Sequence, residues 1–167
     1  MNTIQIDKVL TKPVKYFQEV YPIDILLSTL IKPSIIVINL DKYYMSHSHW
    51  VAVCISDSGY DGYFDSYGLP PLKLENTAFL QRNSISWTFN RHRLQGFNSK
   101  VCGHYCCNYA LQRARGNRWR HSWTYLYLLA TSGTIKRPCT CSALSLESAP
   151  LAGGWCSSSS PASRRYK

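Results

Sequence analysis

Hydrophobic and polar positions along the first 130 residues change between strand-like and helix-like spacing, and no segment is repeated. A compact run of β-branched residues at 34–40 predicts a buried strand. The alternating segment 49–55 and residues 63–65 flank the turn-forming residues 57–59, so we expect these two segments to form a β-hairpin. The sheet is therefore expected to be mixed or antiparallel.

Three other segments have features typical of helices. Residues 22–31 and 70–80 each open with proline, which is favoured in the first turn of a helix. Residues 102–115 end before Gly116, a good C-terminal stop, and this helix begins at a cysteine. With a further short strand expected at 86–89, the predicted fold class is α+β.

Composition changes after residue 130. Residues 131–167 are rich in Ser, Ala, Gly and Pro and lack an apolar period, so we interpret them as a low-complexity tail behind one domain at 1–130. No apolar run reaches the roughly 20 residues of a membrane span, and the N-terminus has no secretory signal. We therefore expect an intracellular monomer that is not secreted and is not a membrane protein.

The seven cysteines are an odd number in a chain without a secretion signal, so reduced thiols are expected. Cys102 stands where a reactive thiol is favoured, because the free N–H groups and dipole of a helix N-terminus stabilise a thiolate. Gly103 and the small residues before Cys102 are expected to let a substrate backbone come close. We interpret Cys54, Cys106 and Cys107 as packing residues.

A base for this thiol is available at the start of the hairpin. If the hairpin is symmetric about Asp57, His49 lies directly across from Asp65, at the open end far from the turn. A carboxylate there would fix one imidazole tautomer and stabilise the imidazolium. His47 competes as the base, and zinc held by His47, His49 and cysteines is a weaker alternative.

Three blocks of sequence, in this order, resemble the adenovirus endopeptidase (adenain) family and the adenain-like proteases of Maverick/Polinton virus-like elements. The blocks are His-Trp-Val-Ala at 49–52, Tyr-Phe-Asp-Ser-Tyr-Gly at 63–68, and Gln-Gly-Phe-Asn-Ser-Lys-Val-Cys-Gly-His-Tyr-Cys-Cys at 95–107. The resemblance covers about residues 20–112. It implies an adenain or ubiquitin-like-protease type of fold, with a mixed sheet and the nucleophile at a helix N-terminus.

The resemblance also implies a role for each matched residue. Cys102 would be the nucleophile, His49 the general base and acid, and Asp65 the residue that orients His49. Gln95 would donate its amide to the oxyanion hole, and Trp50 would wall the site. Such enzymes cut after Gly in Gly-Gly-x or Gly-Ala-x sites, which here implies maturation of virus-like element proteins in the nucleus or virion.

The resemblance is not complete. Adenain receives a viral peptide through a cysteine between the acid and Gln blocks, but no cysteine lies between Asp65 and Gln95, so we do not expect a disulfide-linked activator. No metal or other cofactor is expected either. Two alternatives stay open: a protease specific for ubiquitin-like modifiers, and an inactive copy that binds nucleic acid or protein.

Charge is distributed unevenly. The net charge is +10, yet residues 1–90 carry 7 basic and 8 acidic side chains, whereas residues 91–167 carry 12 basic and 1 acidic. This bias indicates DNA or another polyanion as a candidate partner or activator through phosphate contacts. The candidate contacts are Arg91, Arg93, Lys100, Arg113, Arg115, Arg118 and Arg120; the alternative is a solvated helix end.

Overall fold

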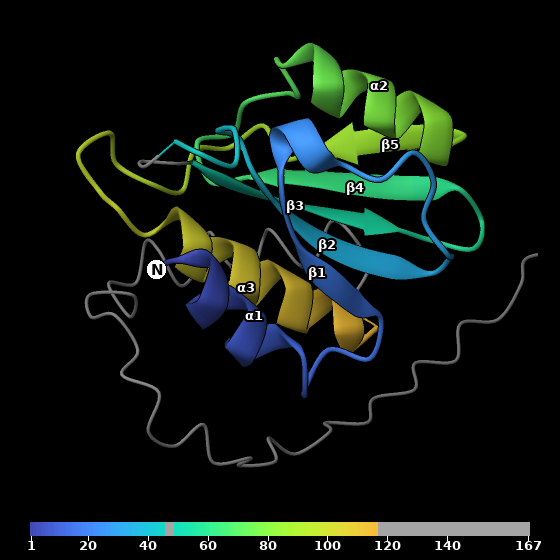
Figure 1. Ribbon diagram of the computed structural model, residues 1–167, viewed down its shortest axis with the longest axis horizontal. Coiled ribbons are helices and arrows are strands. Elements are labelled where there is room, and N and C mark those ends of the chain that lie inside the picture. The colour runs from blue at the N-terminus through green and yellow to red at the C-terminus, as the bar shows by residue number, and fades with distance from the viewer. Residues whose placement is uncertain (46–48, 117–167) are drawn as a thin grey trace, which may run out of the picture.

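The fold is built on one five-stranded mixed sheet (Figure 1). The computed structural model describes residues 1–45 and 49–116. Strands follow the order β1-β2-β3-β4-β5; the outer pairs β1–β2 and β4–β5 are parallel, and β2–β3 and β3–β4 are antiparallel. The predicted α+β class with a mixed sheet is therefore confirmed. The strands are β1 (Phe17–Pro22), β2 (Ser34–Asn39), β3 (Trp50–Ile55), β4 (Tyr60–Asp65) and β5 (Ser86–Phe89).

Helices cover both faces of the sheet, which gives three layers. Helix α2 (Leu74–Asn83) lies on one face, and α1 (Thr3–Leu10) and α3 (Cys102–Ala114) lie side by side on the other (Figure 1). Alternate residues of the interior strand β2 point to opposite faces, so Val37 joins the α1 and α3 core while Ile36 joins the α2 core. Burial on both faces explains why β2 reads as a continuous apolar run.

The prediction of a helix at 22–31 is wrong. Only a single 3-10 turn, η1 (Ile23–Ile25), forms after β1 ends at Pro22. The Leu30 N–H donates to the Asn83 side chain (3.0 Å) instead of to a carbonyl of its own segment, and Pro33 disfavours helical geometry at the residue before it. This apolar segment therefore packs as a loop against α2.

Other element boundaries also differ from the sequence expectations. The predicted helix at 70–80 begins only at Leu74, since the Thr77 hydroxyl bonds the carbonyls of Pro71 and Lys73 ahead of the first turn. Helix α1 and strand β1 were not expected. The signal for α1 was present in Asn2 and Gln5, which form a reciprocal capping box.

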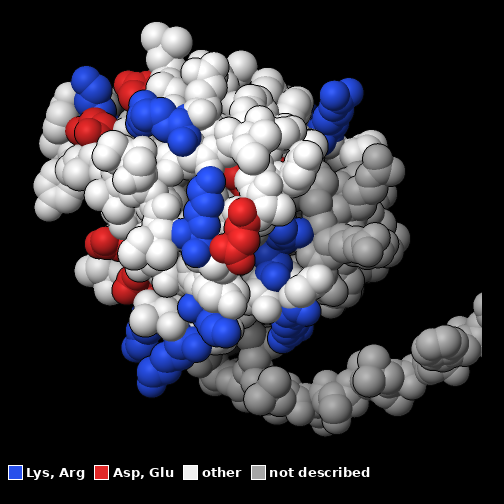
Figure 2. All heavy atoms as spheres, turned by 90° about the vertical axis from the view of Figure 1, so that its right-hand side faces the viewer, with Lys and Arg blue, Asp and Glu red and all other residues white. Residues whose placement is uncertain are grey.

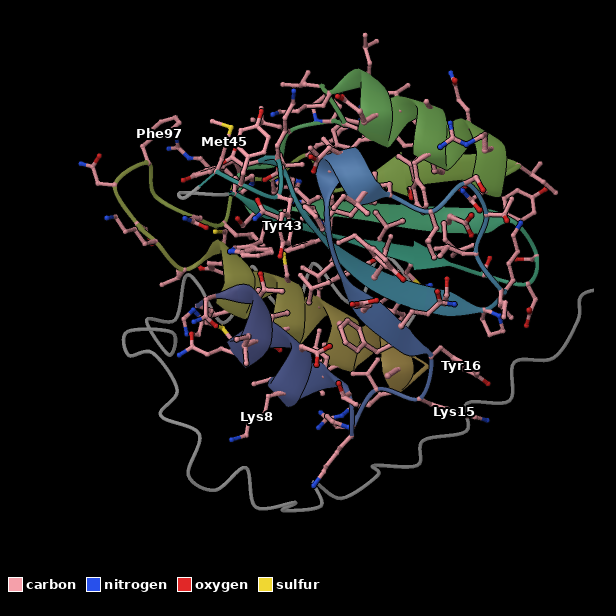
Figure 3. The ribbon with its side chains drawn as sticks, viewed as in Figure 1. Lys8, Lys15, Tyr16, Tyr43, Met45 and Phe97 are labelled. Carbon is pink, nitrogen blue, oxygen red and sulfur yellow. The ribbon has the colours of Figure 1, made fainter. Side chains whose placement is uncertain are left out.

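The elements that carry the predicted site residues meet where the strands start or end, at one end of the sheet. Strand β3 starts at this end, β2, β4 and β5 end there, and α3 begins beside it (left in Figure 1). Residues 40–45 after β2 and the segment before α3 therefore lie at the same end of the molecule, as the labelled Tyr43, Met45 and Phe97 show (Figure 3). Among the described residues, no helix is long and apolar enough to cross a membrane.

Candidate active site

His49 and Asp65 are brought together as predicted, but in a different register. The hairpin pairs Val51 with Asp65, two residues away from the expected pairing of His49 with Asp65. His49 is thus a diagonal neighbour of Asp65 on the same face, within reach of a long side chain. The His49 Nε2 atom lies 2.7 Å from Asp65 Oδ1, and the Asp65 side chain is only 3% exposed.

Cys102 begins α3 and is hydrogen-bonded to His49. Because His49 Nε2 is taken by Asp65, Nδ1 is the ring nitrogen left to face the thiol. The sulfur also accepts from the backbone N–H groups of Trp50 and Gly103. A carboxylate, an imidazole and a thiol therefore form one connected chain at the start of the helix.

The surroundings of the Cys102 and His49 side chains favour a charged pair, a thiolate and an imidazolium. Burial opposes the charged form of Cys102, but the hydrogen bonds from His49 and the two backbone N–H groups outweigh burial and lower the pKa of the thiol. Burial likewise opposes protonation of His49, yet its bonds to Asp65 and Cys102 raise the pKa of the imidazole to about 9. Both shifts favour a thiolate beside an imidazolium over the neutral pair, and that form is a nucleophile with its acid in place.

The backbone and the carboxylate of Asp65 are held by residues that the sequence did not single out. Asn90, which is buried, accepts from the Asp65 N–H (2.9 Å) and donates to the Asp65 carbonyl (2.6 Å). The Tyr67 N–H donates to Asp65 Oδ1 (2.7 Å), the oxygen that also meets His49. The only sequence signal was that Tyr67 lies in one quoted block and that Asn90 follows a predicted strand.

Gln95 is buried next to the candidate site, and both the oxygen and the nitrogen of its side-chain amide are hydrogen-bonded. Its Oε1 accepts from the Ser66 hydroxyl (2.8 Å), and its Nε2 donates to the Ser99 carbonyl (2.5 Å) and to the Tyr67 hydroxyl (3.3 Å). The predicted oxyanion role requires one of these two Nε2 contacts to be exchanged for the substrate. Because the Tyr67 bond is the longer, it is the contact more readily given up.

Two expectations about the site wall change. A Cβ added at Gly103 would lie 3.2 Å from Met1 and Ile6 side-chain atoms and 3.5 Å from Trp50. The space beside Gly103 is therefore filled by α1 and not left open for a substrate backbone. Trp50 is 5% exposed and belongs to the core cluster, so its backbone N–H, more than its ring, faces the candidate site.

The predicted basic cluster is divided between the two ends of α3. Arg91, Arg93 and Lys100 are exposed in the segment that leads into Cys102. Arg113 lies about three helical turns beyond Cys102 and is half-buried, with its Nε 3.5 Å from the Cys54 sulfur. Figure 2 views the end of the molecule opposite the candidate site, where basic side chains are mixed with acidic ones. One continuous basic surface over all these residues is thus not formed.

Several predictions fall on residues outside the described part of the chain. These are His47, Arg118, Arg120, the domain boundary at 130 and the tail at 131–167. Within residues 1–45 and 49–116, no three His, Cys, Asp or Glu side chains converge as metal ligands. The thiols of Cys54, Cys106 and Cys107 are buried, as their interpretation as packing residues requires.

Comparison with known proteins adds no relative. No protein-family model matches the chain. No curated protein matches it either. The functional interpretation therefore depends on the sequence blocks described above and on the geometry of the Cys102, His49 and Asp65 side chains.

Proposed function

We propose that this protein is a cysteine endopeptidase of the adenain type, in which Cys102 is the nucleophile. The observation that carries the proposal is the connected chain from Asp65 through His49 to Cys102, with a lowered pKa at the thiol and a raised pKa at the imidazole. A buried thiol used only for packing has no need of an imidazole and a carboxylate. Strongly perturbed pKa values in such a pair are typical of nucleophilic sites.

The reaction follows from the charges. The Cys102 thiolate attacks the scissile carbonyl, and a C–S bond forms as the carbonyl oxygen becomes an oxyanion. The Cys102 backbone N–H and the Gln95 amide stabilise that oxyanion. The His49 imidazolium then gives its proton to the leaving amine as the C–N bond breaks. Neutral His49 next takes a proton from water as the water oxygen bonds to the acyl carbon. The C–S bond then breaks, which releases a carboxylic acid and returns Cys102 to the thiolate beside the His49 imidazolium.

The resemblance supplies the substrate class. Adenain-like enzymes cut after Gly, so the proposed substrates are proteins with Gly-Gly-x or Gly-Ala-x sites, and the proposed role is maturation of virus-like element proteins. The tail of this chain contains one such sequence, Leu-Ala-Gly-Gly-Trp at 151–155. DNA or another polyanion is proposed as an activator only, through the exposed Arg91, Arg93 and Lys100.

The test is reaction of the full chain with a Gly-Gly vinyl-sulfone probe, followed by mapping of the labelled residue by mass spectrometry. We expect label on Cys102 and turnover of a Leu-x-Gly-Gly-x peptide, both lost in Cys102→Ser and retained in Cys107→Ala. Each assay is run with and without duplex DNA. Absence of label and turnover under both conditions would support the inactive, binding-only alternative.

A second panel separates the two proteolytic alternatives. Intact ubiquitin-like modifier conjugates and short Gly-Gly-x peptides are offered to the same preparation. Cleavage of the peptides at a rate that the folded modifier does not increase supports the endopeptidase. Cleavage confined to the conjugates would assign the protein to the modifier-specific class.

A further inference from the structure

An exposed aromatic path leads outward from His49. The Tyr67 ring lies 4.6 Å from the His49 ring, and the Phe97 ring stacks on Tyr67 at 6.2 Å between centroids. The Arg93 guanidinium lies 4.4 Å above the Phe97 ring, within the range of a cation–π contact. Phe97 is 77% exposed, and Figure 3 shows it on the loop that projects at the candidate-site end. This pair, Phe97 with Arg93, is called the rim platform below.

In the proposed reaction the leaving group departs past His49, and the Tyr67 ring connects His49 to the rim platform. His49 must reach the leaving amine to protonate it, so the substrate segment after the scissile bond runs past the His49 ring. Tyr67 covers one side of that ring and Phe97 continues the surface. Phe97 packs on Tyr67 and under Arg93, yet 77% of the residue stays exposed, which leaves the ring open to a contact with substrate.

Charge at the rim platform has one sign. Arg93 has no carboxylate partner among the described residues, and the nearby Arg91 and Lys100 are also exposed. The segment 91–116 contains five basic residues and no Asp or Glu. An acidic side chain that arrives next to Arg93 would gain an ion pair without displacing an existing one.

We propose that the rim platform is a subsite for the first residues after the scissile bond and that it favours Asp or Glu there. The inference rests on the proposed function and adds the specificity of its leaving-group side. Phe97 supplies the apolar surface for the side-chain stem, and Arg93 supplies the charge that selects the carboxylate.

The test compares peptides that share one Leu-x-Gly-Gly acyl side and carry Asp, Ala or Lys directly after the scissile bond. At about 50 mM salt we expect kcat/KM for Asp to exceed that for Ala by about three- to fivefold, and Lys to fall below Ala. The preference should shrink at about 0.5 M salt. In Arg93→Glu the order should reverse. The matched control is Lys15→Glu, because Figure 3 shows Lys15 at the opposite corner from Phe97, and it should keep the wild-type order.

The outcomes separate this inference from the proposed function. Turnover of all three peptides at equal rates, or an Asp preference that survives Arg93→Glu, would overturn the subsite and leave the endopeptidase intact. Turnover of none, with no probe label on Cys102, would overturn the endopeptidase itself. Binding of duplex DNA that depends on Arg93, without any peptide preference, would assign the rim platform to nucleic acid and likewise overturn the subsite.

Discussion

A single carboxylate sets the charge state of the candidate site. Asp65 Oδ1 accepts from both His49 and the Tyr67 N–H, and its backbone is clamped by Asn90. The sequence identified His49, Asp65 and Cys102 as residues of one site because three blocks occur in a meaningful order. It did not predict Asn90 or Tyr67, whose roles depend on a turn that only the folded backbone brings together. The pairing of His49 with Asp65 was expected in the wrong register, yet a shift of two residues keeps both side chains on one face.

Asp65→Asn tests this dependence. Loss of the carboxylate removes the main charged acceptor that favours imidazolium, so we expect the pKa of His49 to fall from about 9 and the pKa of Cys102 to rise. The kcat/KM for a Gly-Gly-x peptide should fall by about 10²- to 10⁴-fold. The His49 pKa is read from NMR titration of its Cε1–H signal. Asp61→Asn, in the same strand, is the control and should leave that signal unmoved.

At the scale of secondary-structure elements, the turn after β4 positions the segment that carries Gln95. Gly68 follows β4 with φ +74°, and its N–H closes the turn on the Asp65 carbonyl (2.9 Å). The segment that carries Gln95 packs on this turn, where the N–H groups of Leu94 and Gln95 both donate to the Ser66 carbonyl. The strands were largely predictable from their apolar patterns. The segment at 22–31 was not, because its apolar residues are held by a contact with Asn83, far away in sequence.

Gly68→Ala should therefore lower the free energy of unfolding by more than the strain of a positive φ alone would. The added Cβ would lie 2.8 Å from the His92 carbonyl carbon, so the segment carrying Gln95 has to move. Gly116 also has positive φ, but no atom of the described residues lies within 4 Å of its added Cβ. We expect Gly116→Ala to lower the free energy of unfolding by about 1 to 2 kcal/mol, and Gly68→Ala to lower it more and to slow peptide turnover. Equal losses from urea unfolding, with equal turnover, would contradict this account.

At the scale of the whole molecule, the candidate site lies at one end of α3 and the half-buried Arg113 packs at the other. The helix has 13 residues, so about 20 Å separate the Cys102 end from the Arg113 end. The candidate site lies at the Cys102 end, next to the ends of the strands. At the other end, Arg113 contacts Cys54 of β3. Charge counted along the sequence joined these two ends into one cluster, although the helix predicted at 102–115 already separates them.

Arg113→Ala and Arg115→Ala test this separation. Arg113 is half-buried, so its truncation should lower the free energy of unfolding by about 1 to 2 kcal/mol. Arg115 is exposed, and its truncation should change stability by less than about 0.5 kcal/mol. Neither change should alter the rate at which Cys102 is labelled. A large loss of labelling in folded Arg113→Ala would show that the two ends are coupled.

The central claim is that pairing with protonated His49 lowers the pKa of the Cys102 thiol. The direct measurement is the rate of Cys102 alkylation by iodoacetamide from pH 4 to 10, followed by mass spectrometry of the labelled peptide, in wild type and in His49→Gln. Since the pKa of the Cys102 thiol is lowered, the wild-type rate should rise at lower pH than the rate of an ordinary thiol, and it should change again near pH 9 as His49 loses its proton. His49→Gln should move the acid limb to higher pH. A single rise near the pKa of an ordinary thiol, about 8.5, identical in both proteins, would contradict the account.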